Sequence, residues 1–259
     1  MTPSDNDENT LPLAAPCRSL HWQAPLHWLR LGWRDLRQAP AISLGYGLIM
    51  VMLSYAISAA AWYLGNLGLY LGLISGFVFL GPLLALTLYS VSARRENGAR
   101  LTLGATVRDA GRTLSDAMVF AMALLVVFLV WARAATLIHV FFPVAGDTNI
   151  GDWVIFLGIG SAVGAVFCAV IFMASAFSLP MILDRETDTI TAIISSVNAT
   201  LRNKAAMFVW AIAIGACVLA GVMTGYLGFA VLLPLIGHAT WHGYRETLDT
   251  TDWPRKTFE

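Results

Sequence analysis

Long apolar runs alternate with short polar segments over most of the chain. A helix needs about 20 mostly apolar residues to cross the hydrocarbon core of a bilayer. Runs of sufficient length lie at residues 41–64, 67–91, 117–142 and 153–183. A further run, 205–241, would form a helix of roughly 55 Å, against a core of about 30 Å. We divide this run near Thr224 into 205–222 and 226–243. The pattern therefore predicts an all-α membrane bundle of six transmembrane helices.

The basic residues lie on one side of this predicted membrane. Every lysine and arginine except Arg133 falls before the first helix, between helices two and three, between helices four and five, or after helix six. The charged residues of the opposite loops are Asp147 and Asp152. Lysine and arginine favour cytoplasmic loops. The distribution therefore predicts a multi-pass protein of the bacterial inner membrane with both termini in the cytoplasm.

Three of the basic segments repeat apolar residues every three or four positions, which is the spacing of one helix face. The apolar positions are Trp22, Leu26, Leu29, Trp33 and Leu36; Leu103, Val107, Ala110 and Leu114; and Ile190, Ile194, Val197 and Leu201. Asp188 is placed to cap the third helix. Basic amphipathic helices of this kind lie in the headgroup plane. We expect interfacial helices on anionic lipid headgroups, with packing against neighbouring cytoplasmic helices as the alternative.

These elements form an internal repeat. Each third of the chain has an amphipathic helix followed by two transmembrane helices, and the three hairpins share one orientation, which makes them parallel repeats. The second helix of each hairpin carries a proline that is expected to kink it, and an Arg-Glu pair follows. The prolines are Pro82, Pro180 and Pro234, and the pairs are Arg95-Glu96, Arg185-Glu186 and Arg245-Glu246.

Composition supports a bilayer environment. Hydrophobic residues make up 58% of the chain and charged residues 12%, against about 45–50% and about 25% in soluble domains. The basic residues are spread along membrane-adjacent segments, so nothing indicates nucleic-acid binding. Residues 1–19 are polar and predict a disordered tail rather than a signal peptide. Residues 20–248 then form the transmembrane domain, and 249–259 form a cytoplasmic tail.

Two features could carry chemistry. Arg133 is the one charge within an apolar run, and an arginine at mid-bilayer is a functional candidate. The alternative places Arg133 near the outer interface. His238, His242 and Glu246 follow one another at steps of four, so a helix stacks them along one face. Such a set could bind a metal ion or haem, but these residues also suit the cytoplasmic end of a helix.

Small and acidic residues form two further groups. Glycines recur four residues apart within the apolar runs, at Gly68, Gly72, Gly76, Gly160, Gly164, Gly221 and Gly225. Small residues let helix backbones approach closely, so we expect packing within the chain, with a homo-oligomer as the alternative. An acidic cluster is expected to form solvated caps rather than a cation site, and its members are Asp184, Glu186 and Asp188.

Four short stretches carry a family resemblance: Gly32-Trp33-Arg34-Asp35-Leu36, Phe79-Leu80-Gly81-Pro82-Leu83, Phe177-Ser178-Leu179-Pro180-Met181 and Gly237-His238-Ala239-Thr240-Trp241-His242. Through them the chain resembles the bacterial integral-membrane family catalogued as domain of unknown function 2189, over about residues 20–248. The resemblance implies a proteobacterial inner-membrane protein, and it supplies no catalytic residues.

These patterns favour a non-enzymatic accessory, assembly or structural membrane component, with no catalytic residue and no cofactor. A membrane-protein partner would fit this role. One alternative is a small-molecule transporter or channel, in which Arg133, the prolines and the glycine-rich helices line a path. The other is a metal- or haem-binding membrane protein that uses His238 and His242.

Overall fold

The computed structural model describes residues 12–64, 85–141 and 149–258. The regular structure of these residues is helical, which confirms the predicted class. The helices are α1 (Ala24–Gln38), α2 (Pro40–Leu64), α4 (Leu86–Glu96), α5 (Leu103–Arg112), α6 (Leu114–Phe141), α7 (Ile150–Ser175), α8 (Ser178–Asp184), α9 (Thr189–Arg202), α10 (Lys204–Met223) and α11 (Phe229–Thr247).

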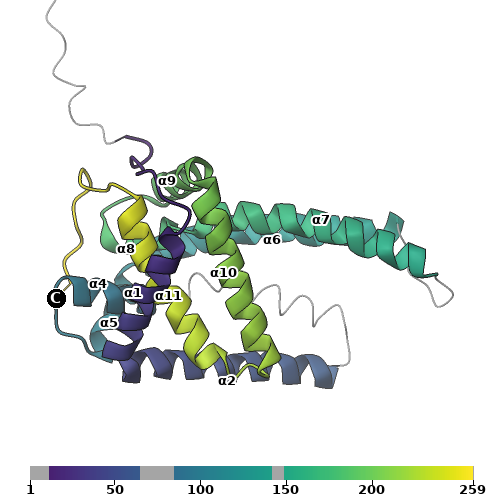
Figure 1. The fold of residues 1–259 in the computed structure, drawn as a ribbon, viewed down its shortest axis with the longest axis horizontal. Helices are drawn as coiled ribbons and strands as arrows, with labels where there is room; N and C mark the ends of the chain where they lie inside the picture. Colours follow the sequence, from purple (N-terminus) through teal and green to yellow (C-terminus); the bar gives the residue numbers. More distant parts are fainter. Residues whose placement is uncertain (1–11, 65–84, 142–148, 259) are drawn as a thin grey trace, which may run out of the picture.

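Several of these helices are long and apolar enough to cross a membrane. Among the described residues the candidate crossings are Pro40–Ala60, Leu114–Ile138, Ile150–Asp184 and Lys204–Met223. In Figure 1, α6 and α7 lie side by side and project away from the other helices. No residue of α7 is buried. An apolar helix with this exposure needs an apolar surrounding, which a bilayer supplies.

The remaining two predicted crossings differ from these four. Most of the predicted helix 67–91 lies outside the described residues, and its last residues belong to α4. The predicted helix 226–243 corresponds to α11, whose first half is apolar. Its second half, from Gly237 onward, is richer in polar residues and largely buried. Within the described residues, four helical stretches therefore qualify as crossings by length and composition.

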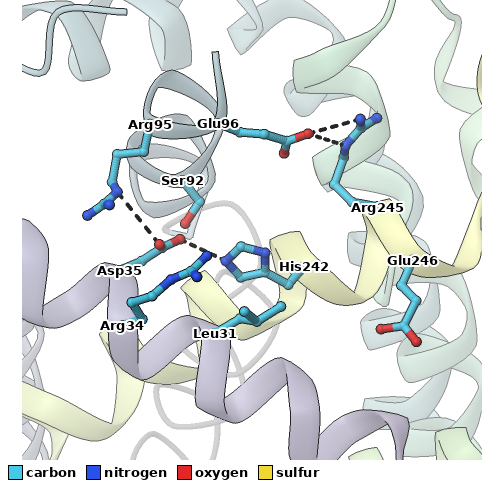
Figure 2. A pocket seen from close by; sticks show the side chains of 9 residues that line it. All are labelled: Leu31, Arg34, Asp35, Ser92, Arg95, Glu96, His242, Arg245 and Glu246. Atoms are coloured by element: carbon cyan, nitrogen blue, oxygen red, sulfur yellow. Dashed lines mark hydrogen bonds and ion pairs between the residues drawn. The ribbon is translucent and has the colours of Figure 1, made fainter. Parts of the chain in front are cut away.

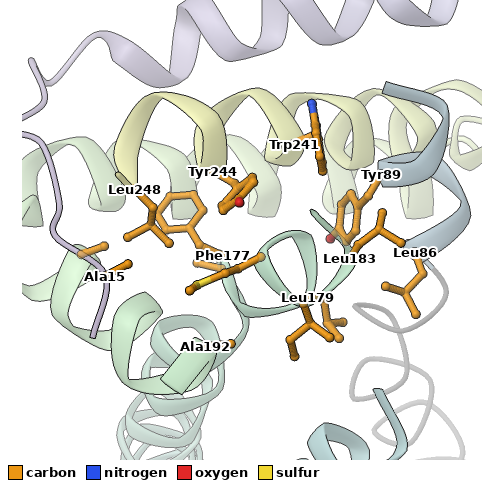
Figure 3. Close-up of a cluster of buried hydrophobic side chains, with 14 of the residues drawn as sticks. Ala15, Leu86, Tyr89, Phe177, Leu179, Leu183, Ala192, Trp241, Tyr244 and Leu248 are labelled. Atoms are coloured by element: carbon orange, nitrogen blue, oxygen red, sulfur yellow. The ribbon is translucent and has the colours of Figure 1, made fainter. Parts of the chain in front are cut away.

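The second half of α11 lies in a compact group of elements that we call the head. The head comprises α1, α4, α5, α8, α9, the second half of α11 and the two terminal segments 12–23 and 248–258. Figure 3 shows part of its core, where Tyr89, Phe177, Trp241 and Tyr244 pack together. Trp28 is also fully buried and meets Phe177 edge to face. Burying one large apolar side chain contributes about 2–3 kcal/mol. The same core continues into α6 through Phe120 and into α10 through Trp210.

Two glycines set how closely α11 approaches its neighbours. A Cβ atom on Gly32 of α1 would lie 2.7 Å from the backbone nitrogen of Ala239, and one on Gly47 of α2 would overlap the carbonyl group of Ala230. The absence of a side chain at these two positions therefore allows the backbones to cross at this distance.

The glycines that the sequence pattern selected have different settings. No described residue comes within 4 Å of a Cβ position at Gly160 or Gly164 of α7. A Cβ atom on Gly221 of α10 would overlap the ring of Phe229. Gly68, Gly72 and Gly76 lie outside the described residues. Within the described structure, Gly221 is therefore a glycine of the four-residue pattern at which two helices pack closely.

The prolines have different local settings. Pro180 lies in the first turn of α8, just after the break that separates α7 from α8. Proline clashes with the carbonyl of the residue four positions earlier, which here is Ala176, at the break. Pro234 lies inside α11, which continues through it. Pro82 lies outside the described residues.

The segments 12–23 and 248–258 are part of the head. The predicted disordered tail over 1–19 fails for residues 12–19, because Ala15 is buried and its N–H donates to Ser195 Oγ at 2.8 Å. An antiparallel bridge also joins Cys17 to Leu248. The predicted tail over 249–259 likewise packs on the head, since Trp253 is buried. Backbone hydrogen bonds, which leave no hydrophobic pattern, hold much of both segments.

The amphipathic helices turn much of their apolar face outward. In α5 the apolar positions Leu103 and Val107 are exposed, whereas Thr106 and Asp109 are buried. In α9, Ile190 and Leu201 are exposed, and the buried residues are alanine, serine and threonine. Leu26 and Trp33 of α1 are exposed, as is Trp22 just before it, while Trp28, Asp35 and Leu36 face the core. The three helices therefore keep much of their apolar face on the outside of the head.

Candidate functional site

The described part of the chain has a pocket of about 440 Å³ between α1, α4 and α11. Charged side chains dominate its lining, and Figure 2 shows how they converge from the three helices. The lining residues are Leu31, Arg34, Asp35, Ser92, Arg95, Glu96, His242, Arg245 and Glu246.

Asp35 lies at the inner wall of the pocket and is 4% exposed. His242 Nε2 donates to its Oδ2 at 2.8 Å, and Arg95 Nε lies 3.6 Å from its Oδ1. Burial acts to raise the pKa of this carboxyl group, but the hydrogen bonds from His242 and Ser92 and the charge of His242 outweigh burial and hold the pKa below its ordinary value. Asp35 is therefore an anion at neutral pH.

A buried polar network continues behind Asp35. His238 is fully buried, and hydrogen bonds of 2.9 Å join its Nε2 to Ser43 Oγ and its Nδ1 to Ser92 Oγ. Ser43 lies in the first turn of α2, and Ser92 lies on α4. Because a buried imidazole without partners would be strongly destabilising, this network fixes how α2, α4 and α11 meet.

A second polar cluster lies beside the pocket and centres on Asp184, which is fully buried. Its carboxylate accepts hydrogen bonds from Tyr244 Oη at 2.9 Å, Arg185 Nε at 3.0 Å and Arg255 Nε at 3.1 Å. The prediction of a solvated cap is therefore wrong for Asp184. It is correct for Asp188, whose side chain accepts from the N–H of Thr191 at the start of α9.

Glu96 connects the second cluster to the pocket. It accepts from Arg245 Nε and from Trp241 Nε1, each at 3.0 Å. Figure 2 shows Glu96 and Arg245 facing each other from α4 and α11. Two of the Arg-Glu pairs predicted by the repeat, Arg95-Glu96 and Arg245-Glu246, therefore line a single pocket.

The candidate metal ligands have other roles in the structure. Both ring nitrogens of His238 bond to serines, His242 bonds to Asp35, and Glu246 accepts from Trp28 Nε1 at 2.8 Å. In the described part of the chain, no three His, Cys, Asp or Glu side chains are grouped so that they could hold a metal ion.

Arg133 lies on α6 and is exposed. It forms no hydrogen bond or ion pair with any residue that the structure describes, and it does not line the pocket. The candidate intramembrane residue and the candidate metal ligands are therefore not part of one site.

Sequence reasoning did not select Arg34, Asp35 or Ser92 as site residues. Arg34 and Asp35 occur in a stretch that carried the family resemblance, and the repeated Arg-Glu pairs marked the α4 and α11 sides of the pocket. Ser92 had no signal of its own, because its partner His238 is 146 positions away in the sequence.

Exposed apolar helices combined with a head rich in buried polar groups define an all-helical integral membrane protein. The family model described as "Predicted integral membrane protein (DUF2189)" matches residues 69–184. This match confirms the family resemblance for that part of the predicted range 20–248. No curated protein and no solved structure matches the chain.

Proposed function

We propose that this protein is a non-enzymatic accessory or structural component of the bacterial inner membrane. In this proposal six helices cross the membrane as three hairpins, and the head lies on the cytoplasmic surface together with both chain ends. The interfacial helices α1, α5 and α9 rest on anionic headgroups. A membrane-protein partner binds to the transmembrane part or to the head.

The observation that supports this proposal is the outward apolar face of α1, α5 and α9. In α5, Val107 is 53% exposed while Asp109 is 5% exposed, which is the reverse of a helix that covers a soluble core. Basic residues flank the apolar face, and α5 carries Arg108 and Arg112. An exposed apolar stripe with flanking cations is typical of helices that lie in the headgroup plane.

The length of α6 bears on Arg133. Arg133 follows Leu114, the first residue of α6, by a distance of about 28 Å along the helix at 1.5 Å per residue. This is close to the full thickness of the hydrocarbon core, about 30 Å. If α6 starts at the cytoplasmic headgroups, Arg133 reaches the outer interface, where arginine can remain hydrated.

The use of the buried charges supports a structural role rather than catalysis. Arg94 and Asp109 form a buried pair that joins α4 to α5. Asp184 binds Tyr244 and Arg255, and so holds α11 and the C-terminal segment on α8. These side chains direct their hydrogen bonds at other parts of the chain, which rigidifies the head as a platform.

Topology reporters test the six-helix arrangement. Fusions after Asn66, near Asp147 and after Thr224 are expected to report the periplasm, and a fusion at the C-terminus is expected to report the cytoplasm. A cytoplasmic signal from any of the first three would contradict the proposed arrangement.

Co-purification tests the accessory role. After mild solubilisation, we expect the full-length chain to be isolated with the same membrane protein in repeated preparations. Isolation of the chain alone under several mild detergents would contradict an accessory role.

A further inference from the structure

We propose that the pocket between α1, α4 and α11 binds a phosphate monoester group, with Arg34 and Arg95 as its ligands. The phosphate could belong to a lipid headgroup or to a soluble molecule, and the chemistry at the two guanidinium groups is the same. This inference does not depend on the number of membrane crossings or on an accessory role.

The carboxylates of the pocket are already engaged by donors from the chain. Asp35 accepts from His242, Glu96 accepts from Arg245 and Trp241, and Glu246 accepts from Trp28. These bonds compensate much of the negative charge that an entering anion would meet. The donors that remain available therefore decide which ligand the pocket can take.

Two guanidinium groups keep unused donors. Arg95 Nε is buried and has no hydrogen-bond partner, and its nearest carboxylate oxygen, on Asp35, is 3.6 Å away, which is too far for a good hydrogen bond. A buried donor without an acceptor is strongly disfavoured. Arg34 is exposed and forms no hydrogen bond or ion pair with any described residue. Figure 2 shows both side chains beside Asp35.

A phosphate monoester matches these donors in charge and shape. Its charge at neutral pH is about −1.5 to −2, close to the charge of two guanidinium groups. Each planar guanidinium can donate two parallel hydrogen bonds to phosphate oxygens. A carboxylate carries a single charge and two oxygens, so one guanidinium group alone would use both of its oxygens. A pocket of about 440 Å³ has room for the phosphate and part of the group attached to it.

The location of the pocket makes both phosphate sources accessible. Arg34 follows Trp33, which is 41% exposed on the apolar face of α1, and the Arg37 guanidinium lies 5.6 Å from the centre of the Trp33 ring. The pocket therefore borders the face that we place at the membrane surface. It is also accessible to solvent, since the His242 side chain that lines it is 15% exposed.

Binding to the purified full-length chain tests the inference in three arms. The first arm adds inorganic phosphate to the protein in a neutral detergent. The second places the protein in phosphatidylcholine nanodiscs that contain phosphatidic acid, a phosphate monoester lipid. The third uses nanodiscs whose phosphatidylglycerol content is adjusted to the same total charge. Thermal unfolding reports stabilisation in every arm, and calorimetric titration gives Kd for phosphate.

Each arm uses Arg34→Gln and Arg95→Gln, with Arg100→Gln as the matched control. Arg100 is exposed, precedes α5 and lies outside the pocket, so its removal changes the net charge equally. We expect Arg34→Gln and Arg95→Gln to weaken binding about tenfold or more, since each removes charge-assisted hydrogen bonds. Arg100→Gln should bind as the wild type does. Arg34→Gln also guards against misfolding, because Arg34 forms no hydrogen bond or ion pair with any described residue.

The outcomes separate the two sources. Stabilisation by inorganic phosphate assigns the site to soluble phosphate compounds, and stabilisation by phosphatidic acid alone assigns it to the lipid headgroup. Absence of any effect from both probes would overturn the inference. Equal effects of phosphatidylglycerol and phosphatidic acid without a phosphate effect, or equal behaviour of the three variants, would also overturn it. Topology reporters are independent of all these results.

Discussion

The head and the α6–α7 pair bury very different kinds of residue. In the head, charged and polar side chains such as Asp109, Asp184 and His238 are buried together with tryptophans. In α7, which is almost entirely apolar, no residue is buried. The head is stable because specific partners compensate most of its buried polar groups, whereas α6 and α7 depend on an apolar solvent outside the protein. The chain therefore combines a head that is stabilised by specific polar pairs with helices that are stabilised by the surrounding lipid.

The comparison predicts that losing a carboxylate has a large effect in the head and a small one in α7. Asp109 accepts two hydrogen bonds from Arg94, at 2.6 and 2.8 Å, and the Arg94 side chain is fully buried. Asp109→Ala leaves that charge without its carboxylate, so we expect a loss of about 3 to 5 kcal/mol in the free energy of unfolding. Chemical unfolding in detergent, followed by tryptophan fluorescence, measures this loss.

The matched variant is Asp152→Ala. Asp152 lies in the first turn of α7, in a capping box with Asn149, so its loss should lower stability by about 1 kcal/mol or less. Equal losses from Asp109→Ala and Asp152→Ala would show that the head does not depend on its buried pairs.

The second prediction compares two glycines. Gly47→Leu places a side chain against the backbone of Ala230, which must move away. Overpacking of this kind is expected to cost about 3 kcal/mol or more. Gly160→Leu meets no described residue within 4 Å and should leave the unfolding temperature in detergent unchanged. If Gly160→Leu proves as disruptive as Gly47→Leu, α7 packs on a partner, and light scattering would then report whether the partner is a second copy.

Local signals explain which parts of this fold could be predicted. The predicted helix 41–64 corresponds to α2, Pro40–Leu64, and Asp188 caps α9 as predicted. Both could be predicted because the length of an apolar run and the identity of a capping residue depend only on residues that are close together in the sequence. Amphipathic spacing also located α1, α5 and α9. Spacing alone does not say which face turns inward, since an apolar stripe satisfies either a protein core or a bilayer.

Contacts distant in sequence explain what could not be predicted. Ser92 and His238 are 146 positions apart, and Ala15 and Ser195 are 180 apart. Nothing near Ala15 indicates that its N–H has a buried acceptor. The pocket is likewise built from three helices whose charged residues, taken singly, look like those of any solvated helix surface. The repeated Arg-Glu pairs and the four-residue spacing of His242 and Glu246 were local signs of it.

The third prediction concerns pH and applies to the head. The folded-state pKa of Asp35 lies below its ordinary value of 3.8, so the stability that this carboxylate contributes is present above that value and is lost as the pH falls through the folded pKa. Asp35→Asn should therefore lower stability by about 2 kcal/mol at neutral pH. The difference between wild type and variant should shrink below about pH 4, measured by unfolding at a series of pH values. A difference that is constant down to pH 3 would contradict the ionic role of Asp35.

The smallest expected effect on stability comes from the exposed apolar stripe of α5. This helix belongs to the head but presents an apolar face outward, as α6 and α7 do. Val107 and Arg108 are adjacent and both exposed, but successive residues on a helix point in directions about 100° apart. Val107→Cys and Arg108→Cys, each carrying an environment-sensitive dye, should unfold within about 0.5 kcal/mol of the parent chain. In nanodiscs that contain brominated lipids, we expect a blue-shifted and strongly quenched signal at position 107 and a weaker response at 108. If the dye at position 107 emits as it does in water, α5 does not lie on the membrane. Its apolar stripe would then be a surface for another protein. In that case α5 would belong entirely to the head, which is stabilised by polar pairs, and no face of α5 would depend on lipid.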